Sequence, residues 1–208
     1  MRILFWLPVL LWSCTTAAPT PETLSDASHS ATQTTASAMP AQAVPTPSAI
    51  ESDWLIVPGQ RIGQTALDDD PQQLMDRQGR PDASDAAMGK AWLVWNGHRQ
   101  GTTLAVFTTY ADTSTTRKAI RQIRITAARF QTSSGIHTGL KLPAIRQAFP
   151  NLTQAENTAP DVAIRYDDPA QGISFEVDKP GAKAVCTAIL VYPAGSSPTA
   201  YLPLPEVN

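Results

Sequence analysis

A low-complexity stretch confines folding to the part of the chain that follows it. Residues 15–50 consist almost entirely of Thr, Ala, Ser, Pro and Gln, with Glu22, Asp26 and His29 among the few exceptions. Such a composition buries too little apolar surface to offset the entropy lost on ordering. We therefore expect a disordered tether over residues 14–50, which leaves about 145–150 residues to fold, the size of one domain.

The segment before the tether has the pattern of a signal peptide over residues 1–13. Arg2 is followed by a ten-residue apolar run that contains Pro8, which is too short for a membrane-spanning helix of roughly 20 residues. Leu11, Ser13 and Cys14 resemble the lipobox of bacterial lipoprotein leaders. The resemblance implies lipidation of Cys14 and stable membrane attachment by several acyl chains. The alternative is an ordinary secretory leader with a chance cysteine.

Charge and cysteine content argue against a nucleic-acid partner and against a core held by a disulfide. The formal net charge of −2 and the pI near 5.9 provide no electrostatic drive toward nucleic acid, which we exclude as a partner. The chain has two cysteines, Cys14 and Cys186. If Cys14 carries lipid, Cys186 has no partner within the chain, so the core must form without a disulfide.

The first half of the remaining chain predicts one short helix and several strands. Asp70 as N-cap, Pro71 at the first helical position and Gly79 at the end predict a helix over residues 71–78. A loop is expected from there to about residue 90. Strands are expected at residues 54–57, 91–95, 102–108 and 119–126, with a hairpin turn at Asn96-Gly97.

The second half shows the same order of elements. A Pro-started helix is expected from Leu142 to just before Pro150, with strands at residues 162–167, 172–178 and 184–192. The sequence therefore predicts an α+β domain over residues 51–193, with short helices on an antiparallel sheet. We expect two related units, residues 54–129 and 130–193, followed by a Pro-rich tail over residues 194–208.

This order of elements resembles that of two groups of bacterial proteins. Gly79-Arg80-Pro81 follows the helix that carries Leu74, and the aromatic strand with Trp92 and Trp95 comes next. The pattern is similar to the tandem repeats of SmpA/OmlA-type outer-membrane-assembly lipoproteins and of β-lactamase-inhibitor-protein-like domains. The resemblance implies a non-enzymatic role in which a sheet face contacts a partner protein. The alternative is a generic α+β arrangement.

No motif in the sequence predicts catalysis, a metal site or a cofactor. The histidines His29, His98 and His137 fall in three separate segments. The residues Ser133-Ser134-Gly135 near His137 lack the G-x-S-x-G elbow and an orienting acid. Cys186 lies within an apolar strand, where a free cysteine behaves as a small hydrophobic residue.

Two surface features are candidates for an interface. Basic residues are frequent between Arg117 and Arg129, with no acidic residue between them, and could meet an acidic partner or anionic lipid. Residues three apart on a strand face opposite ways, so one tryptophan of the aromatic strand is exposed unless both sheet faces are covered. The candidate interface residues are Trp92, Trp95, Arg117, Arg121 and Arg124. The alternative is a solvated, charged edge strand.

Together these features predict a lipid-anchored protein of the cell envelope that acts as a binding or assembly module. The membrane, through the lipid, and an envelope protein are the expected partners. Thr15 and Thr16 follow Cys14, and the absence of Asp at these positions resembles the pattern of lipoproteins that are sorted to the outer membrane. We therefore expect a periplasm-facing outer-membrane lipoprotein. Two alternatives are an envelope hydrolase whose site forms only in three dimensions, and an inhibitor-like module that binds an extracellular enzyme.

Overall fold

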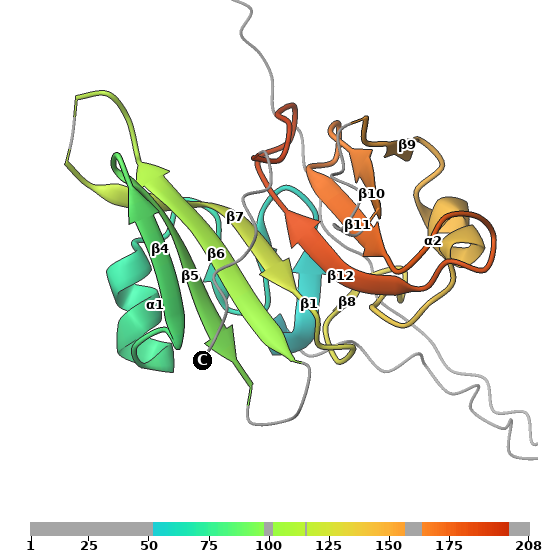
Figure 1. Ribbon diagram of the computed structural model, residues 1–208, viewed down its shortest axis with the longest axis horizontal. Coiled ribbons are helices and arrows are strands. Elements are labelled where there is room, and N and C mark those ends of the chain that lie inside the picture. The colour runs from blue at the N-terminus through green and yellow to red at the C-terminus, as the bar shows by residue number, and fades with distance from the viewer. Residues whose placement is uncertain (1–51, 98–101, 115, 157–163, 200–208) are drawn as a thin grey trace, which may run out of the picture. The chain divides into compact units, whose positions relative to one another are not determined.

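The computed structural model describes residues 52–97, 102–114, 116–156 and 164–199 (Figure 1). These residues form two short helices and two sheets rich in antiparallel pairs, which confirms the predicted α+β class. The predicted signal peptide, Cys14, the tether and residues 200–208 of the tail lie outside the described residues. Within the described part of the chain, no helix is long and apolar enough to span a membrane.

Both predicted helices are present, and local sequence explains their ends. Helix α1 spans Pro71–Gln78, and the side chain of Asp70 accepts a hydrogen bond from the Gln72 N–H at 2.9 Å. Gly79 ends the helix with a φ of 82°, a conformation that glycine adopts at little cost. Helix α2 spans Leu142–Ala148 and has no side-chain cap at its N-terminus.

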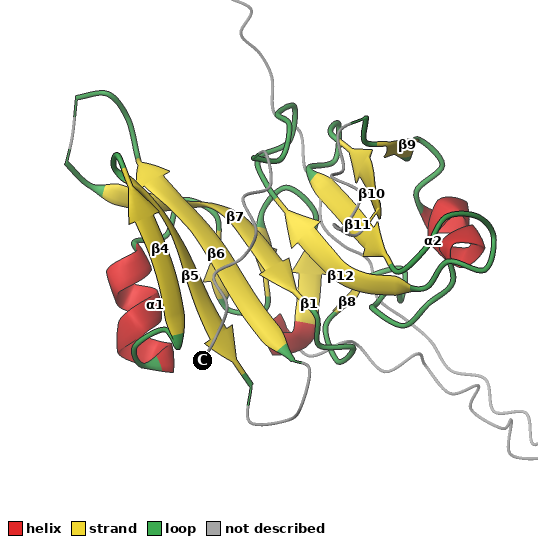
Figure 2. Ribbon diagram, in the orientation of Figure 1, coloured by secondary structure: helices red, strands yellow, loops and turns green. Residues whose placement is uncertain are grey.

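The main sheet has eight strands among the described residues, and α1 and α2 lie near its opposite ends (Figure 2). Its strand order is β4-β5-β6-β7-β12-β11-β10-β9. The four strands that follow α1 therefore lie beside the four that follow α2, and β7 pairs with β12 between them. The strands are β4 Ala83–Ala87, β5 Lys90–Asn96, β6 Thr103–Tyr110, β7 Lys118–Ile125, β9 Thr153–Gln154, β10 Ile164–Asp168, β11 Ile173–Val177 and β12 Cys186–Val191.

A second, smaller sheet connects the segments that precede the two helices. Its order is β3-β2-β1-β8, and β1 pairs with β8 in parallel. Its strands also contact the main sheet at β7. A short 3-10 helix, η1, precedes it. The elements are η1 Ser52–Trp54, β1 Leu55–Val57, β2 Arg61–Ile62, β3 Thr65–Ala66 and β8 Gln131–Thr132.

The prediction of a loop between Gly79 and about residue 90 is wrong, because β4 lies there. The strand Ala83–Ala87 has no apolar alternation, and four of its five residues are exposed. It pairs with β5 from Ala83 opposite Val94 to Ala87 opposite Lys90. Backbone hydrogen bonds to a neighbouring strand hold it in place, and no pattern in its own side chains reveals that neighbour.

The core lies between the main sheet and the two helices. Leu74 of α1 and Ile145 of α2 pack with Ile123, Phe175 and many other apolar residues on one face of the sheet, which we call the helix face. Cys186 belongs to this core, as the sequence predicts. Burial raises the pKa of its thiol from 9.0 to about 12, and the nearby Glu176 carboxylate adds to the effect.

Burial of Cys186 makes a testable prediction about its reactivity. Because the thiolate is the reactive form, iodoacetamide at pH 8 should leave Cys186 unmodified in the folded protein and alkylate it in urea, as measured by peptide mass mapping. An unfolded thiol ionises near its ordinary pKa and the folded one does not. The free energy of unfolding should therefore fall as the pH rises above about 9. Rapid alkylation of the folded protein would contradict this burial.

Candidate functional site

The five predicted interface residues do not form one surface. Trp95 belongs to the core cluster on the helix face. Trp92 packs on the opposite face of β5, as predicted from their spacing, and Arg124 lies on this same face through its register with Ala105 and Val94. We call this second face the Trp92 face. Both tryptophans are buried, with exposed fractions of 2% and 7%.

The other two arginines are held near the N-terminal end of α1. The guanidinium of Arg121 forms an ion pair with the Asp68 carboxylate and donates to the carbonyl of Ala111. Arg117 donates to the carbonyl oxygen of Asp68 at 3.3 Å. Both side chains therefore contact the segment that leads into α1, and neither lies beside Trp92.

The Trp92 face is apolar over β5 and β6. Trp92, Val94, Ala105 and Phe107 form a separate buried cluster, and the rings of Trp92 and Phe107 lie 5.3 Å apart. The adjacent residue on β7, Gln122, is paired with Phe107 in register and accepts a hydrogen bond from the Thr199 N–H at 2.9 Å. The alternative of a solvated, charged edge strand is therefore wrong for β7, because this strand lies between β6 and β12 and its Gln122 is buried and bonded.

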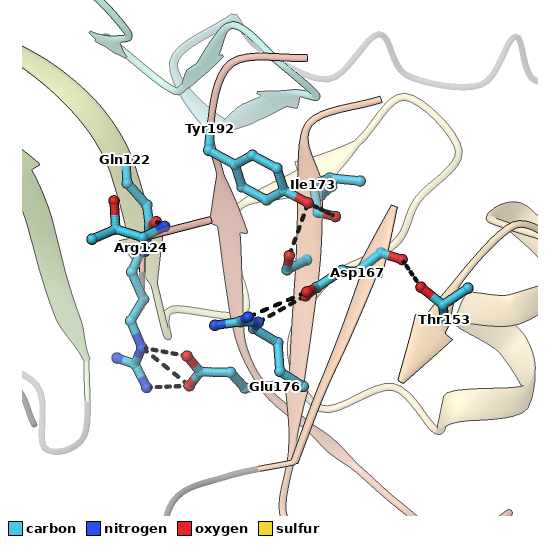
Figure 3. A network of polar contacts seen from close by, with 10 residues as sticks. Gln122, Arg124, Thr153, Asp167, Ile173, Glu176 and Tyr192 are labelled. Carbon is cyan, nitrogen blue, oxygen red and sulfur yellow. Dashed lines mark hydrogen bonds and ion pairs between the residues drawn. The ribbon is translucent and has the colours of Figure 1, made fainter. Parts of the chain in front are cut away.

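Over β7, β11 and β10 the same face carries a network of charged side chains (Figure 3). Arg124 reaches across β12 to Glu176, with contacts of 3.1 and 3.2 Å from Nε and of 2.7 Å from Nη2. The Glu176 side chain is only 2% exposed and that of Arg124 13%. Arg165 makes a similar two-bond pair with Asp167, at 2.7 and 3.2 Å.

A buried tyrosine completes this network. The Tyr192 hydroxyl donates to the Ile173 carbonyl at 3.1 Å and accepts from the Ser174 hydroxyl at 3.2 Å (Figure 3). Burial raises the pKa of Tyr192 to about 12. The phenol therefore stays protonated at physiological pH and acts as a neutral hydrogen-bonding group.

These contacts indicate a structural role for the network. Each arginine is paired with a carboxylate within the sheet, so the charges neutralise one another. Elsewhere, Ser134 Oγ lies 2.9 Å from Thr132 Oγ1, and His137 Nδ1 lies 2.6 Å from the Thr138 carbonyl. Serine and histidine are thus engaged with separate partners. Among the described residues there is no group of three or more His, Cys, Asp or Glu that could hold a metal ion.

A cleft of about 780 Å³ opens on the helix face beyond the last turn of α1. Its floor includes Trp95, Leu104 and Ile125, which are cross-strand neighbours on β5, β6 and β7. The eight residues of α1 span about 12 Å, whereas eight-residue strands such as β6 span about 26 Å. The helix is therefore too short to cover the ends of these strands. We call this site the Trp95 cleft.

The two walls of the Trp95 cleft come from separate parts of the chain. One wall follows α1, where the Trp95 Nε1–H donates to the Gly79 carbonyl at 2.9 Å. The other wall comes from η1, the turn between β2 and β3, and the segment after β7. On that side the Trp54 and Phe130 rings meet edge to face at 5.2 Å. The wall residues include Gln78, Arg80, Asp82, Asp53, Trp54, Gln64, Arg129 and Phe130.

Several polar side chains of the cleft have no hydrogen-bonding or ion-pair partner among the described residues. Within residues 52–97, 102–114, 116–156 and 164–199, no ion pair or side-chain hydrogen bond is found for Arg80, Asp53, Gln64 or Gln78. Arg129 stacks on Trp54, with its guanidinium carbon 4.0 Å from the ring centre. The Trp95 cleft thus combines an apolar floor with polar groups that are available to a ligand.

Sequence reasoning identified one residue of this cleft, Trp95, and missed the rest. Trp54 and Phe130 lie far apart in the sequence, and each stands alone in a short segment. Arg80 entered the prediction only within Gly79-Arg80-Pro81, and Arg129 only as the end of the basic segment that begins at Arg117. The parallel pairing of β1 with β8 brings Trp54 and Phe130 together, and no local spacing in the sequence records such a pairing.

Comparisons with known proteins give one structural similarity. No protein-family model matches the chain, and no curated protein sequence matches it. Among solved structures, the chain is similar to the crystal structure of the uncharacterized protein yfeY from Escherichia coli, at 10% sequence identity and a TM-score of 0.34. The similarity covers 68% of this chain and 95% of that one.

The pair between Arg124 and Glu176 leads to a stability prediction. Glu176→Gln leaves the nearly buried Arg124 without its counter-charge, and should lower the free energy of unfolding by about 3–5 kcal/mol. Replacing both residues by Met should restore most of this loss, because no unpaired charge remains. Urea unfolding measures both.

The control for this prediction is Lys179→Gln, which breaks the exposed pair with Asp178. It should leave the unfolding curve unchanged, because exposed pairs contribute little. A Glu176→Gln variant as stable as the parent protein would show that the buried pair contributes nothing.

Proposed function

We propose that this protein is a lipid-anchored protein of the cell envelope, on the outer membrane and facing the periplasm, that acts as a non-enzymatic binding or assembly module. The observation that carries the binding role is the Trp95 cleft. Its volume of about 780 Å³ falls within the range of about 300–1,000 Å³ that is typical of ligand sites. Its composition, with Trp, Phe and Arg side chains, is that of residues favoured at binding interfaces.

The Trp92 face supports a binding role less well in this structure. Its apolar cluster is buried, and so are the carboxylate residues of its charged network, Glu176 and Asp167. Arg124, Glu176, Arg165 and Asp167 are already paired with one another. In the Trp95 cleft, by contrast, several polar groups on the walls are available, so we propose that the contact with a partner lies there.

The absence of a catalytic arrangement among the described residues supports binding over catalysis. Nucleophilic catalysis needs a serine or cysteine within reach of a base. Cys186 is buried in the core with its thiol protonated, and the described serine and histidine near residue 135 bond elsewhere. Among the described residues that line the cleft there are arginines, carboxylates and amides, but no histidine, cysteine or serine.

The anchor is tested by mass spectrometry of the mature N-terminus. We expect the first residue to be Cys14 carrying a diacylglycerol and an added acyl chain, because the leader resembles a lipobox. Cys14→Ala should remove both the lipid mass and the protein's retention in the membrane fraction. An unmodified N-terminus that starts at another residue would contradict the lipid anchor.

The cleft is tested by site-specific photo-crosslinking in intact cells. A benzoylphenylalanine at Gln78, on the wall of the Trp95 cleft, should form adducts that mass spectrometry identifies as one recurrent species. The matched control places the same probe at Gln147, which is exposed on α2 and is not part of the cleft. Equal adducts at both positions, or none at Gln78, would show that the cleft is not the contact site.

A further inference from the structure

We propose that the Trp95 cleft binds an anionic amphiphile, a molecule with one hydrocarbon chain and a negatively charged head such as a phosphate or carboxylate. This inference rests on the proposed function in using the same cleft, and it adds the chemistry of the ligand. Three features of the cleft support it: its floor, the state of the backbone beneath that floor, and the charges on its walls.

The floor is a continuous apolar surface. Trp95 lies opposite Leu104, and Leu104 lies opposite Ile125 in the strand register. With strands about 4.8 Å apart, this row alone is about 10 Å long. Ile62 and Ala127 extend the apolar lining beyond it. Each CH₂ group of a ligand that this floor removes from water should raise the affinity roughly fourfold.

The backbone beneath the floor favours hydrocarbon over a polypeptide. Strand β6 lies between β5 and β7 and pairs with both, so its main-chain groups are engaged. An extended peptide lying on this floor would find no backbone partners there, and its own N–H and C=O groups would lose water without replacement. A hydrocarbon chain has no polar groups to satisfy.

The charges on the walls favour a negative head group. Arg129 is held against Trp54 at 4.0 Å and Phe130 at 5.4 Å, and Arg80 lies on the other wall. Within the described residues neither guanidinium has a carboxylate partner. Two uncommitted arginines offer paired N–H donors of the kind that bind phosphate and carboxylate oxygens.

Two carboxylates, Asp53 and Asp82, also line the cleft, and within the described residues neither forms an ion pair with Arg80 or Arg129. Asp82 accepts a hydrogen bond from the Asn96 N–H at 2.7 Å, so one of its oxygens is committed. The described lining of the cleft thus holds two arginines, Arg80 and Arg129, and two carboxylates. The attraction for a negative head group therefore comes from the uncommitted guanidinium donors and not from an excess of positive charge.

Isothermal titration calorimetry tests the inference on the full chain carrying Cys14→Ala, which has no attached lipid to compete. The probes are dodecyl phosphate, dodecyl maltoside and dodecyltrimethylammonium, each below its micelle-forming concentration, with octyl phosphate and inorganic phosphate. Dodecyl phosphate should bind at one site per chain, and the neutral and cationic heads about tenfold or more weaker.

Octyl phosphate and inorganic phosphate separate the contribution of the hydrocarbon chain from that of the phosphate head group. Octyl phosphate should bind on the order of 100-fold more weakly than dodecyl phosphate, because it lacks four CH₂ groups. Inorganic phosphate should not bind measurably. Binding of inorganic phosphate as tight as that of dodecyl phosphate would show that the cleft takes a free anion, and would overturn the inference.

Variants test whether the probes bind in the Trp95 cleft. Arg80→Gln with Arg129→Gln should lower the affinity for dodecyl phosphate to that for dodecyl maltoside, and leave the maltoside unchanged. The control, Arg117→Gln with Arg146→Gln, makes the same charge change at exposed residues outside the cleft and should leave both affinities unchanged. Leu104→Trp, which fills the floor, should weaken every dodecyl probe.

Other outcomes contradict the inference, and they can be distinguished from outcomes that contradict the proposed function. Equal affinity for the three head groups, no binding, or a head-group preference that survives loss of Arg80 and Arg129 would each contradict an anionic amphiphile. If Gln78 crosslinks an acidic protein segment while no amphiphile binds, the cleft is a binding site and its ligand class is wrong. If dodecyl phosphate binds as expected but Gln78 forms no adduct, the ligand class holds and the partner contact in cells does not.

Discussion

The antiparallel pairing of β7 with β12 is the contact on which the rest of the structure depends. Ile123 pairs with Val191 and Ile125 with Ile189 in this seam, which joins two sets of four strands into one sheet. Without it, both strands would present unpaired edges, and the apolar rows of the helix face would end at the seam. The pairing also lets Arg124 on β7 reach Glu176 on β11, so the charged network depends on it as well.

A second constraint, the shortness of α1, creates the cleft. An amphipathic helix normally covers the strands on which it packs, but α1 ends at Gln78, before the row from Trp95 to Ile125 is covered. The small sheet and the segment after β7 close the other side. The floor thus consists of core residues that reach the cleft with only a few per cent of their surface exposed, such as Trp95 at 7% and Ile125 at 4%. Rigid strands position such a site more accurately than loops do.

The sequence predicted those elements whose determinants are local. The ends of α1 follow from Asp70, Pro71 and Gly79, and the opposed faces of Trp92 and Trp95 follow from the period of a strand. It missed β4, whose strand conformation depends on a neighbour, and it did not show that the predicted interface residues lie apart. Arg117, Arg121 and Arg124 are close in sequence, yet Asp68 and Glu176, distant along the chain, hold them in different places.

By itself, then, the sequence determined the α+β class, the two short helices and the buried place of Cys186, because capping and alternation act within a few residues. The lipid anchor at Cys14 stays a prediction from the leader. Only the tertiary structure decided which sheet face is closed and where a cleft opens. Trp54, Arg80, Trp95 and Phe130 come together through strand pairing between distant segments, and no local pattern records such pairing.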